Sequence, residues 1–266
     1  MSYSFFRALL LPLLASVAFA QDPKATTPGD MSNMPGMAVP DTAQKQGDAE
    51  DGGAAQTISS MDHRHMDMGS HMRMTSLREA KPGDQERAAK IAETARTVAE
   101  KYTDYQTALN DGFKIFLPNV PQKQYHFTNY KYAAEAATGF NPEHPTSLLY
   151  EKQGDGYKLV GVMYTAPKRL NEDELNERIP LSIAQWHEHV NFCAPPANMT
   201  LEEKKQGMLG PNAKFGLRGS IATQEECDTA GGKFHPVIFN WMVHLYPMEK
   251  TPEAIWSAAR GHDHTD

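Results

Sequence analysis

Residues 147–164 read Ser147-Leu-Leu-Tyr-Glu-Lys-Gln-Gly-Asp-Gly-Tyr-Lys-Leu-Val-Gly-Val-Met-Tyr164, which is two runs rich in strand-forming residues around a Gly-Asp-Gly turn. Aromatic and β-branched residues favour strands, and a short glycine-containing turn between two such runs is typical of a β-hairpin. We therefore predict two antiparallel strands, at residues 147–153 and 157–164.

A long helix is predicted before this hairpin. Apolar residues recur at three- and four-residue steps from Ala88 to Leu109, which is the period of one helix face. Asp84 suits the N-cap of this helix, and the sequence Asn-Asp-Gly at residues 110–112 suits its end.

The remaining elements decide the predicted fold class. Residues 180–192 and 237–246 are predicted strands, and capping-box sequences at residues 200–203 and 223–226 predict two short helices. This order predicts one α+β domain over residues 84–266, with the long N-terminal helix and the short helices packed on an antiparallel sheet.

The first 20 residues have the pattern of a secretory signal peptide. Arg7 supplies a positive charge, an apolar run follows to Val17, and Ala18-Phe-Ala20 is a small-x-small cleavage sequence. The apolar run is too short to span a bilayer. We predict cleavage near Ala20 and a soluble protein in a periplasm or outside the cell, without a transmembrane segment.

Residues 21–83 contain no Phe, Tyr or Trp and are rich in Ala, Gly, Asp, Thr, Pro and Met. Such a segment has too little apolar surface to offset the entropy of ordering it, so we predict a disordered tail. The chain carries a net charge of −7. This charge argues against nucleic acid or an anionic membrane as the main partner.

The second half of this tail is dense in thioethers and imidazoles that lie among Asp, Arg, Gly and Ser rather than among apolar residues. Soft sulfur and imidazole ligands select copper, whereas hard cations favour carboxylates. The alternative is a linker whose methionines consume oxidants. The candidate metal ligands in the tail are Met61, His63, His65, Met66, Met68, His71, Met72 and Met74.

A second candidate metal site lies in the predicted domain, in Gln185-Trp-His-Glu-His-Val-Asn-Phe-Cys193. Alternation along a strand places His187 and His189 on one face and Glu188 on the other. If the predicted strand at 237–246 is a neighbour, His244 supplies a third imidazole, and His126 is the best remaining candidate. The alternative is that each histidine is a hydrogen-bonded core residue.

The two cysteines of the chain, Cys193 and Cys227, are predicted to form a disulfide, because an even pair in an oxidising compartment is most simply explained in this way. The alternative is that a cysteine thiolate binds a metal ion.

Two resemblances extend this interpretation. The Met/His-rich stretch at residues 61–68 resembles segments of periplasmic copper-resistance proteins, which implies copper binding by the tail. The folded part resembles uncharacterised secreted bacterial proteins that combine a His-Phe-x-Asn segment, a Leu-Val-Gly-Val-x-Tyr hairpin and a late aromatic-flanked histidine. These motifs are His126-Phe-Thr-Asn129, Leu159-Val-Gly-Val-Met-Tyr164 and His244-Leu-Tyr246. This second resemblance implies a shared fold and a His-lined site, without a known reaction.

The sequence therefore supports three functional hypotheses. The first is a secreted metal-binding protein, for copper with zinc as the alternative ion, that uses both the tail and the domain histidines. The second is a metal-dependent enzyme at the same histidines, with a pocket lined by Tyr125, Trp186 or Trp241. The third is a non-catalytic envelope module with structural histidines.

Overall fold

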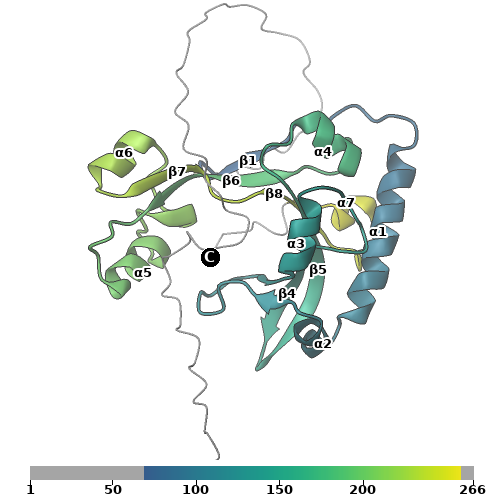
Figure 1. Cartoon of the computed structure of the whole chain (residues 1–266), viewed down its shortest axis with the longest axis horizontal. Helices are drawn as coiled ribbons and strands as arrows, with labels where there is room; N and C mark the ends of the chain where they lie inside the picture. Colours follow the sequence, from purple (N-terminus) through teal and green to yellow (C-terminus); the bar gives the residue numbers. More distant parts are fainter. Residues whose placement is uncertain (1–68, 259–266) are drawn as a thin grey trace, which may run out of the picture. The chain divides into compact units, whose positions relative to one another are not determined.

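The computed structural model describes residues 69–258 (Figure 1). The predicted signal peptide, the tail as far as Met68 and the last eight residues lie outside these residues. The described elements, in chain order, are β1 (Met72–Met74), α1 (Asp84–Lys101), α2 (Tyr105–Asn110), β2 (Lys114–Ile115), β3 (Tyr125–Thr128), α3 (Tyr130–Ala136), β4 (Ser147–Gln153), β5 (Gly156–Ala166), α4 (Glu172–Arg178), β6 (His187–Ala194), α5 (Leu201–Leu209), the 3₁₀ turn η2 (Gly216–Arg218), α6 (Gln224–Thr229), β7 (Lys233–Val237), β8 (Trp241–Leu245) and α7 (Pro252–Ile255).

The strands form one antiparallel sheet whose spatial order differs from their order in the chain. Helices pack against this sheet, which is the predicted α+β arrangement. The strand order is β1-β6-β8-β5-β4-β3-β2, and β7 pairs separately with β6. Strands β4 and β5 form the predicted hairpin, whose turn contains Gly154 at a φ of 58°. Because β1 pairs with β6, and β8 lies between β6 and β5, the sheet joins distant parts of the sequence.

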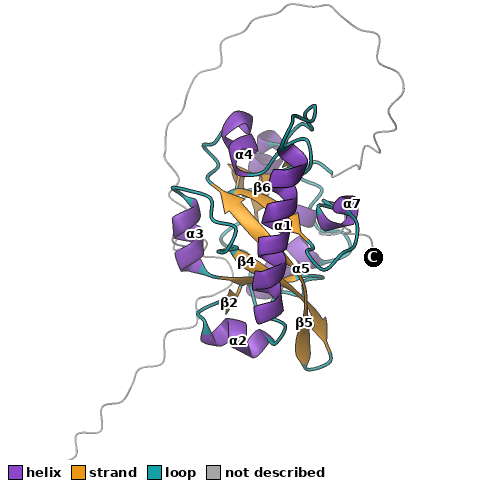
Figure 2. Ribbon diagram, turned by 90° about the vertical axis from the view of Figure 1, so that its right-hand side faces the viewer, coloured by secondary structure: helices purple, strands orange, loops and turns teal. Residues whose placement is uncertain are grey.

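Helix α1 runs across one face of this sheet (Figure 2). The helix turns small side chains inward, since Ala95 and Ala99 are at most 1% exposed, and this allows close approach to the strands. The Tyr150 hydroxyl donates a hydrogen bond of 2.6 Å to the Tyr102 carbonyl at the end of the helix. We call the sheet face under α1 the apolar face, and its main side chains are Phe127, Leu148, Tyr150, Val162, Tyr164, Trp186, Val243 and Leu245.

The predicted helix over residues 84–109 is divided in the structure. Helix α1 ends at Lys101, and α2 begins at Tyr105 with the Asp104 carboxylate as its cap. Gly83, not Asp84, is the N-cap of α1. The prediction missed this division because the apolar spacing continues through it, while the capping group that starts α2 is a single side chain.

Two predicted strands were too long. Residues 180–186 form a turn, in which the Ile183 and Ala184 backbone N–H groups donate to the Pro180 carbonyl, and β6 begins only at His187. The stretch at residues 237–246 contains the end of β7 and all of β8, with an irregular connection between them. Apolar composition alone does not separate a strand from a buried turn of similar residues.

The boundary predicted between tail and domain also differs from the structure. Residues 72–74, which we assigned to the disordered tail, form strand β1 at the edge of the sheet and pair with β6. Their order comes from a partner more than 100 residues away in the sequence, so local composition could not show it.

The segment from β6 to β7, which includes α5 and α6, forms a smaller cluster at one end of the sheet, on the left in Figure 1. The predicted disulfide is present and joins Cys193 of β6 to Cys227 of α6. Both predicted capping boxes are also present, at Thr200 and Thr223.

Candidate metal centre

The face of the sheet opposite α1 carries the domain histidines. Directly paired residues of antiparallel strands lie on the same face, so the strand register assigns each side chain to a face. Met72 pairs with His189 and Met74 with His187. His187 then pairs with Met242, Met163 with His244, and His126 with Leu149. We call this surface the His/Met face; its members are Met72, Met74, His126, Leu149, Met163, His187, His189, Met242 and His244.

Four imidazoles form a continuous row on this face. The ring centres of His126 and His244 lie 5.6 Å apart, those of His244 and His187 lie 5.0 Å apart, and those of His187 and His189 lie 5.8 Å apart. The structure therefore brings together all four histidines that the sequence analysis selected in the domain.

The sheet must curl to bring His126 next to His244. Strand β3 is separated from β8 by β4 and β5, and three strand spacings in a flat sheet would amount to about 14 Å. On this face Gly161 of β5 leaves room for the end of β8, because a Cβ atom there would lie 2.7 Å from the Leu245 carbonyl oxygen and 2.9 Å from the Tyr246 ring.

Burial favours the uncharged form of His126. His187 and His244 are buried, at 1% and 5% exposure. Desolvation lowers the pKa of His126 to about 4, and a hydrogen bond with the Gln124 backbone offsets it only in part. A neutral imidazole has a nitrogen lone pair that can bind a metal ion, whereas imidazolium has none.

Thioethers and aromatic rings surround the imidazoles. Met163 and Met242 are buried and pack with Leu149 and Tyr246 in an apolar cluster of their own. The Phe239 ring contacts His189 edge to face at 5.7 Å. The sequence analysis missed Met163, because in the sequence it is an ordinary apolar residue of a strand.

Within residues 69–258, no three His, Cys, Asp or Glu side chains are arranged as they stand to hold an ion. Thioethers are a further class of ligand on this face, and they are soft ligands that select Cu(I). Imidazoles and thioethers together are ligand types that suit a soft ion.

Glu188 lies on the opposite face, as strand alternation predicted, and it forms an ion pair with Arg73 of β1. Burial raises the pKa of the Glu188 carboxyl, while Arg73 acts to lower it.

The pocket expected for an enzyme is not formed by its predicted residues, because Tyr125, Trp186 and Trp241 belong to the core on the apolar face.

The tail candidates are divided by the structure. Met61, His63, His65, Met66 and Met68 lie outside the described residues. His71, Met72 and Met74 belong to the folded part, where the buried His71 ring donates from Nε2 to the Gly219 carbonyl at 2.8 Å.

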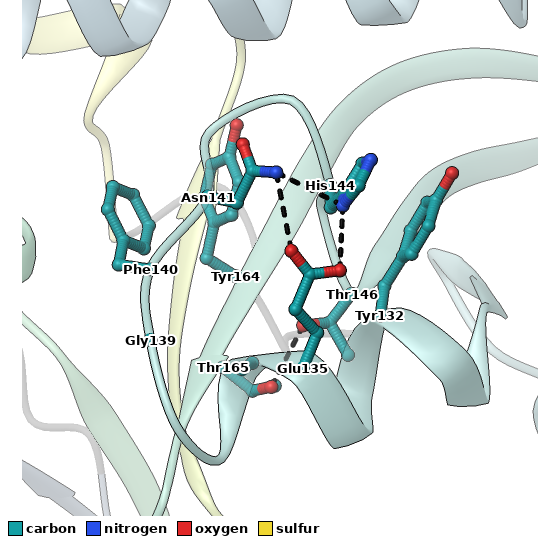
Figure 3. Close-up of a pocket in the computed structure, with 10 residues that line it drawn as sticks. Tyr132, Glu135, Gly139, Phe140, Asn141, His144, Thr146, Tyr164 and Thr165 are labelled. Atoms are coloured by element: carbon teal, nitrogen blue, oxygen red, sulfur yellow. Dashed lines mark hydrogen bonds and ion pairs between the residues drawn. The ribbon is translucent and has the colours of Figure 1, made fainter.

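A separate polar cluster, which the sequence analysis did not identify, lies between α3 and the start of β4 (Figure 3). The Nδ1 atom of His144 is 2.7 Å from the Glu135 carboxylate, and its ring stacks on Tyr132 at 4.2 Å. The adjoining hollow encloses about the space of one water molecule, so it is too small for an organic substrate. We interpret this cluster as a polar clamp between helix and loop.

No protein-family model, curated protein or solved structure matches this chain at a significant level. None of the helices within residues 69–258 is long and apolar enough to cross a membrane.

Proposed function

We propose that this is an exported copper-binding protein that holds Cu(I) on the His/Met face of its sheet. The observation that carries the proposal is the row of His126, His244, His187 and His189, with ring centres 5.0–5.8 Å apart, on a face shared with four methionines. Two imidazoles that bind one ion at about 2 Å place their ring centres at a comparable separation.

The ligand chemistry favours copper over zinc. Structural Zn²⁺ requires four ligands in a closed tetrahedron, most often with thiolates. Here both cysteines are joined in a disulfide, and the Glu188 carboxylate lies on the other face. Thioethers and neutral imidazoles suit Cu(I), which is a softer ion.

The proposed location rests on two features. The first 20 residues have the pattern of a signal peptide, and the Cys193–Cys227 disulfide is of the kind that persists in oxidising compartments. In this proposal, the thioethers and imidazoles of residues 61–68 collect copper before the domain binds it.

The test uses the full chain with the tail ligands removed: Met61, Met66 and Met68 to Leu, and His63 and His65 to Gln. We call this chain the tail-substituted protein. Its Cu(I) affinity is measured by competition with a chromophoric Cu(I) chelator under anaerobic conditions. In this protein the additional double substitution His187→Gln and His244→Gln should weaken Cu(I) binding by roughly 10- to 100-fold or more. Loss of a group that only supports a metal ligand already has an effect of that size.

The matched control is His235→Gln. His235 lies on β7, opposite Phe192, and is not part of the row. Its substitution should leave the Cu(I) affinity unchanged. If the His187/His244 variant binds Cu(I) as tightly as the tail-substituted protein while its circular dichroism remains native, the proposal is wrong.

A further inference from the structure

Strand β1 places two thioethers at the edge of the His/Met face. Met72 and Met74 are two residues apart and therefore project to the same side, opposite His189 and His187 respectively. Directly opposed side chains of this kind have Cβ atoms about 4.5–5.5 Å apart. The four residues thus form a compact block of two sulfurs and two imidazoles across two adjacent strands.

The rest of β1 holds these thioethers in register. Arg73 points to the opposite face, where its guanidinium pairs with Glu188 and lies 5.4 Å from the centre of the Trp241 ring. The Thr75 N–H donates to the Trp186 carbonyl at 2.8 Å, and the Trp186 N–H donates to Thr75 Oγ1 at 3.0 Å. A strand of only three residues is therefore held on the face opposite the thioethers and at its end.

Accessibility differs along the His/Met face. His187 and His244 are buried, whereas Met72, Met74 and His189 are half-buried. An ion from solution therefore reaches the ends of the row before its centre, and of the two ends, His126 and the β1 edge, only the β1 edge carries the thioethers of Met72 and Met74. The edge also lies next to residue 69, where the described chain continues from the Met/His-rich tail sequence.

We propose that Met72, Met74 and His189 form an outer Cu(I) site through which copper is loaded onto the inner histidines. This inference rests on the proposed function and adds a second site and a direction of transfer. His187 lies between the two sites, opposite Met74 on one side and Met242 on the other. Transfer is a ligand exchange without electron transfer: one copper–sulfur bond at the edge breaks as a copper–nitrogen bond to His187 forms.

The test is the double substitution Met72→Leu and Met74→Leu in the tail-substituted protein. Leucine retains most of the volume and the apolar character of methionine, so β1 should still dock. We expect the number of Cu(I) ions bound to fall by one, and the stopped-flow rate of loading from a Cu(I)–chelator complex to fall at least tenfold. X-ray absorption should show fewer sulfur ligands per copper.

The control is the pair Met199→Leu and Met208→Leu, whose side chains pack near the disulfide, away from the row. This control should bind and load copper like its parent. An unchanged stoichiometry and loading rate in the Met72/Met74 variant would refute the outer site. The proposed function would still stand in that case if the His187/His244 variant lost binding.

A second measurement does not depend on any substitution in β1. Hydrogen exchange of the tail-substituted protein is followed by mass spectrometry with and without Cu(I). Binding across β1 and β6 should slow the exchange of backbone amides in residues 71–75. If Cu(I) protects β6 but not β1, copper is bound without the edge strand and the outer site is wrong.

Discussion

The two faces of the sheet are built from the same strands, but they differ completely in chemistry. Trp186 and His187 are neighbours in the chain, both almost fully buried, and lie on opposite faces. Leu148 and Leu149 are divided in the same way: the first belongs to the core under α1, and the second to the apolar cluster beside the histidines.

This difference separates what folding requires from what binding requires. Aromatic and aliphatic side chains under α1 remove apolar surface from water, which is the main favourable contribution to folding. Burying imidazoles costs free energy unless their polar atoms are satisfied, so a face selected for stability alone would carry aliphatic residues. A binding role of the His/Met face is our proposal, and the following predictions examine it.

The largest expected effect on stability is on the apolar face. Trp186→Ala should lower the free energy of unfolding by about 3–5 kcal/mol, because it leaves a large cavity in the core. His187→Gln, one residue further on, should lower it by less, because glutamine leaves a smaller cavity than alanine does at Trp186, while weakening Cu(I) binding. Urea denaturation and chelator competition measure the two quantities. Equal losses of stability would remove the distinction between the faces.

Removal of the disulfide tests whether the cluster at the end of the sheet contributes to stability and not to Cu(I) binding. Replacing both Cys193 and Cys227 by Ser should cost about 3–4 kcal/mol in the chain-entropy model, since the two residues are 34 positions apart. Thermal unfolding measures the loss. Cu(I) affinity should remain that of the parent at temperatures where the variant is folded, and a parallel loss of affinity would count against an independent site.

The ion pair across β1 and β6 is expected to have an intermediate effect. Arg73→Met should lower the free energy of unfolding by about 1–3 kcal/mol, because it leaves the buried Glu188 carboxylate without its partner. This loss is smaller than for a fully buried pair because the Arg73 side chain is 58% exposed and solvent screens its charge. Arg78→Met is the matched control on an exposed pair with Asp173 and should cost less than about 1 kcal/mol. Chemical denaturation of both variants decides between these values.

The smallest effect is expected where α1 begins. Asp84 accepts hydrogen bonds from the Ser182 hydroxyl and the Lys81 N–H, and these bonds lower the pKa of its carboxyl. Asp84→Asn should cost about 1 kcal/mol at neutral pH. The Asp84 contribution is present above the pKa of the unfolded state, near 4, and is lost as the pH falls through the lower pKa of the folded state.

The difference between wild type and the Asp84→Asn variant should therefore shrink in denaturation curves as the pH falls from about 5 through the lower pKa of the folded state. The substitution lies in the helix layer, so it should leave Cu(I) affinity unchanged at pH 7. A difference in stability that is constant with pH would show that the Asp84 carboxylate is not the group responsible.

Local patterns predicted the elements whose causes are local. The hairpin around Gly154, the capping boxes at Thr200 and Thr223, and the helix at Asp84 each depend on residues within a few positions of one another. Alternation also placed His187 and His189 on one face, with Glu188 on the other.

Predictions failed where a distant partner decides the structure. The tail composition gave no sign that Met72 would pair with His189, because the hydrogen bonds that order β1 come from β6. The start of β6 was placed too early because the turn at Pro180 has apolar residues like those of a strand. The position of Met163 beside His244 depends on strand register, which no local pattern contains.

The sequence by itself determined the α+β composition, the cysteine pair and the four histidines that could share a site. Only the tertiary structure decided that these histidines form one row. Strand order and the curl of the sheet bring the ring of His126 on β3 to within 5.6 Å of the ring of His244 on β8. The physical reason is that side-chain alternation is fixed residue by residue along a strand, whereas the pairing of strands is a property of the whole chain.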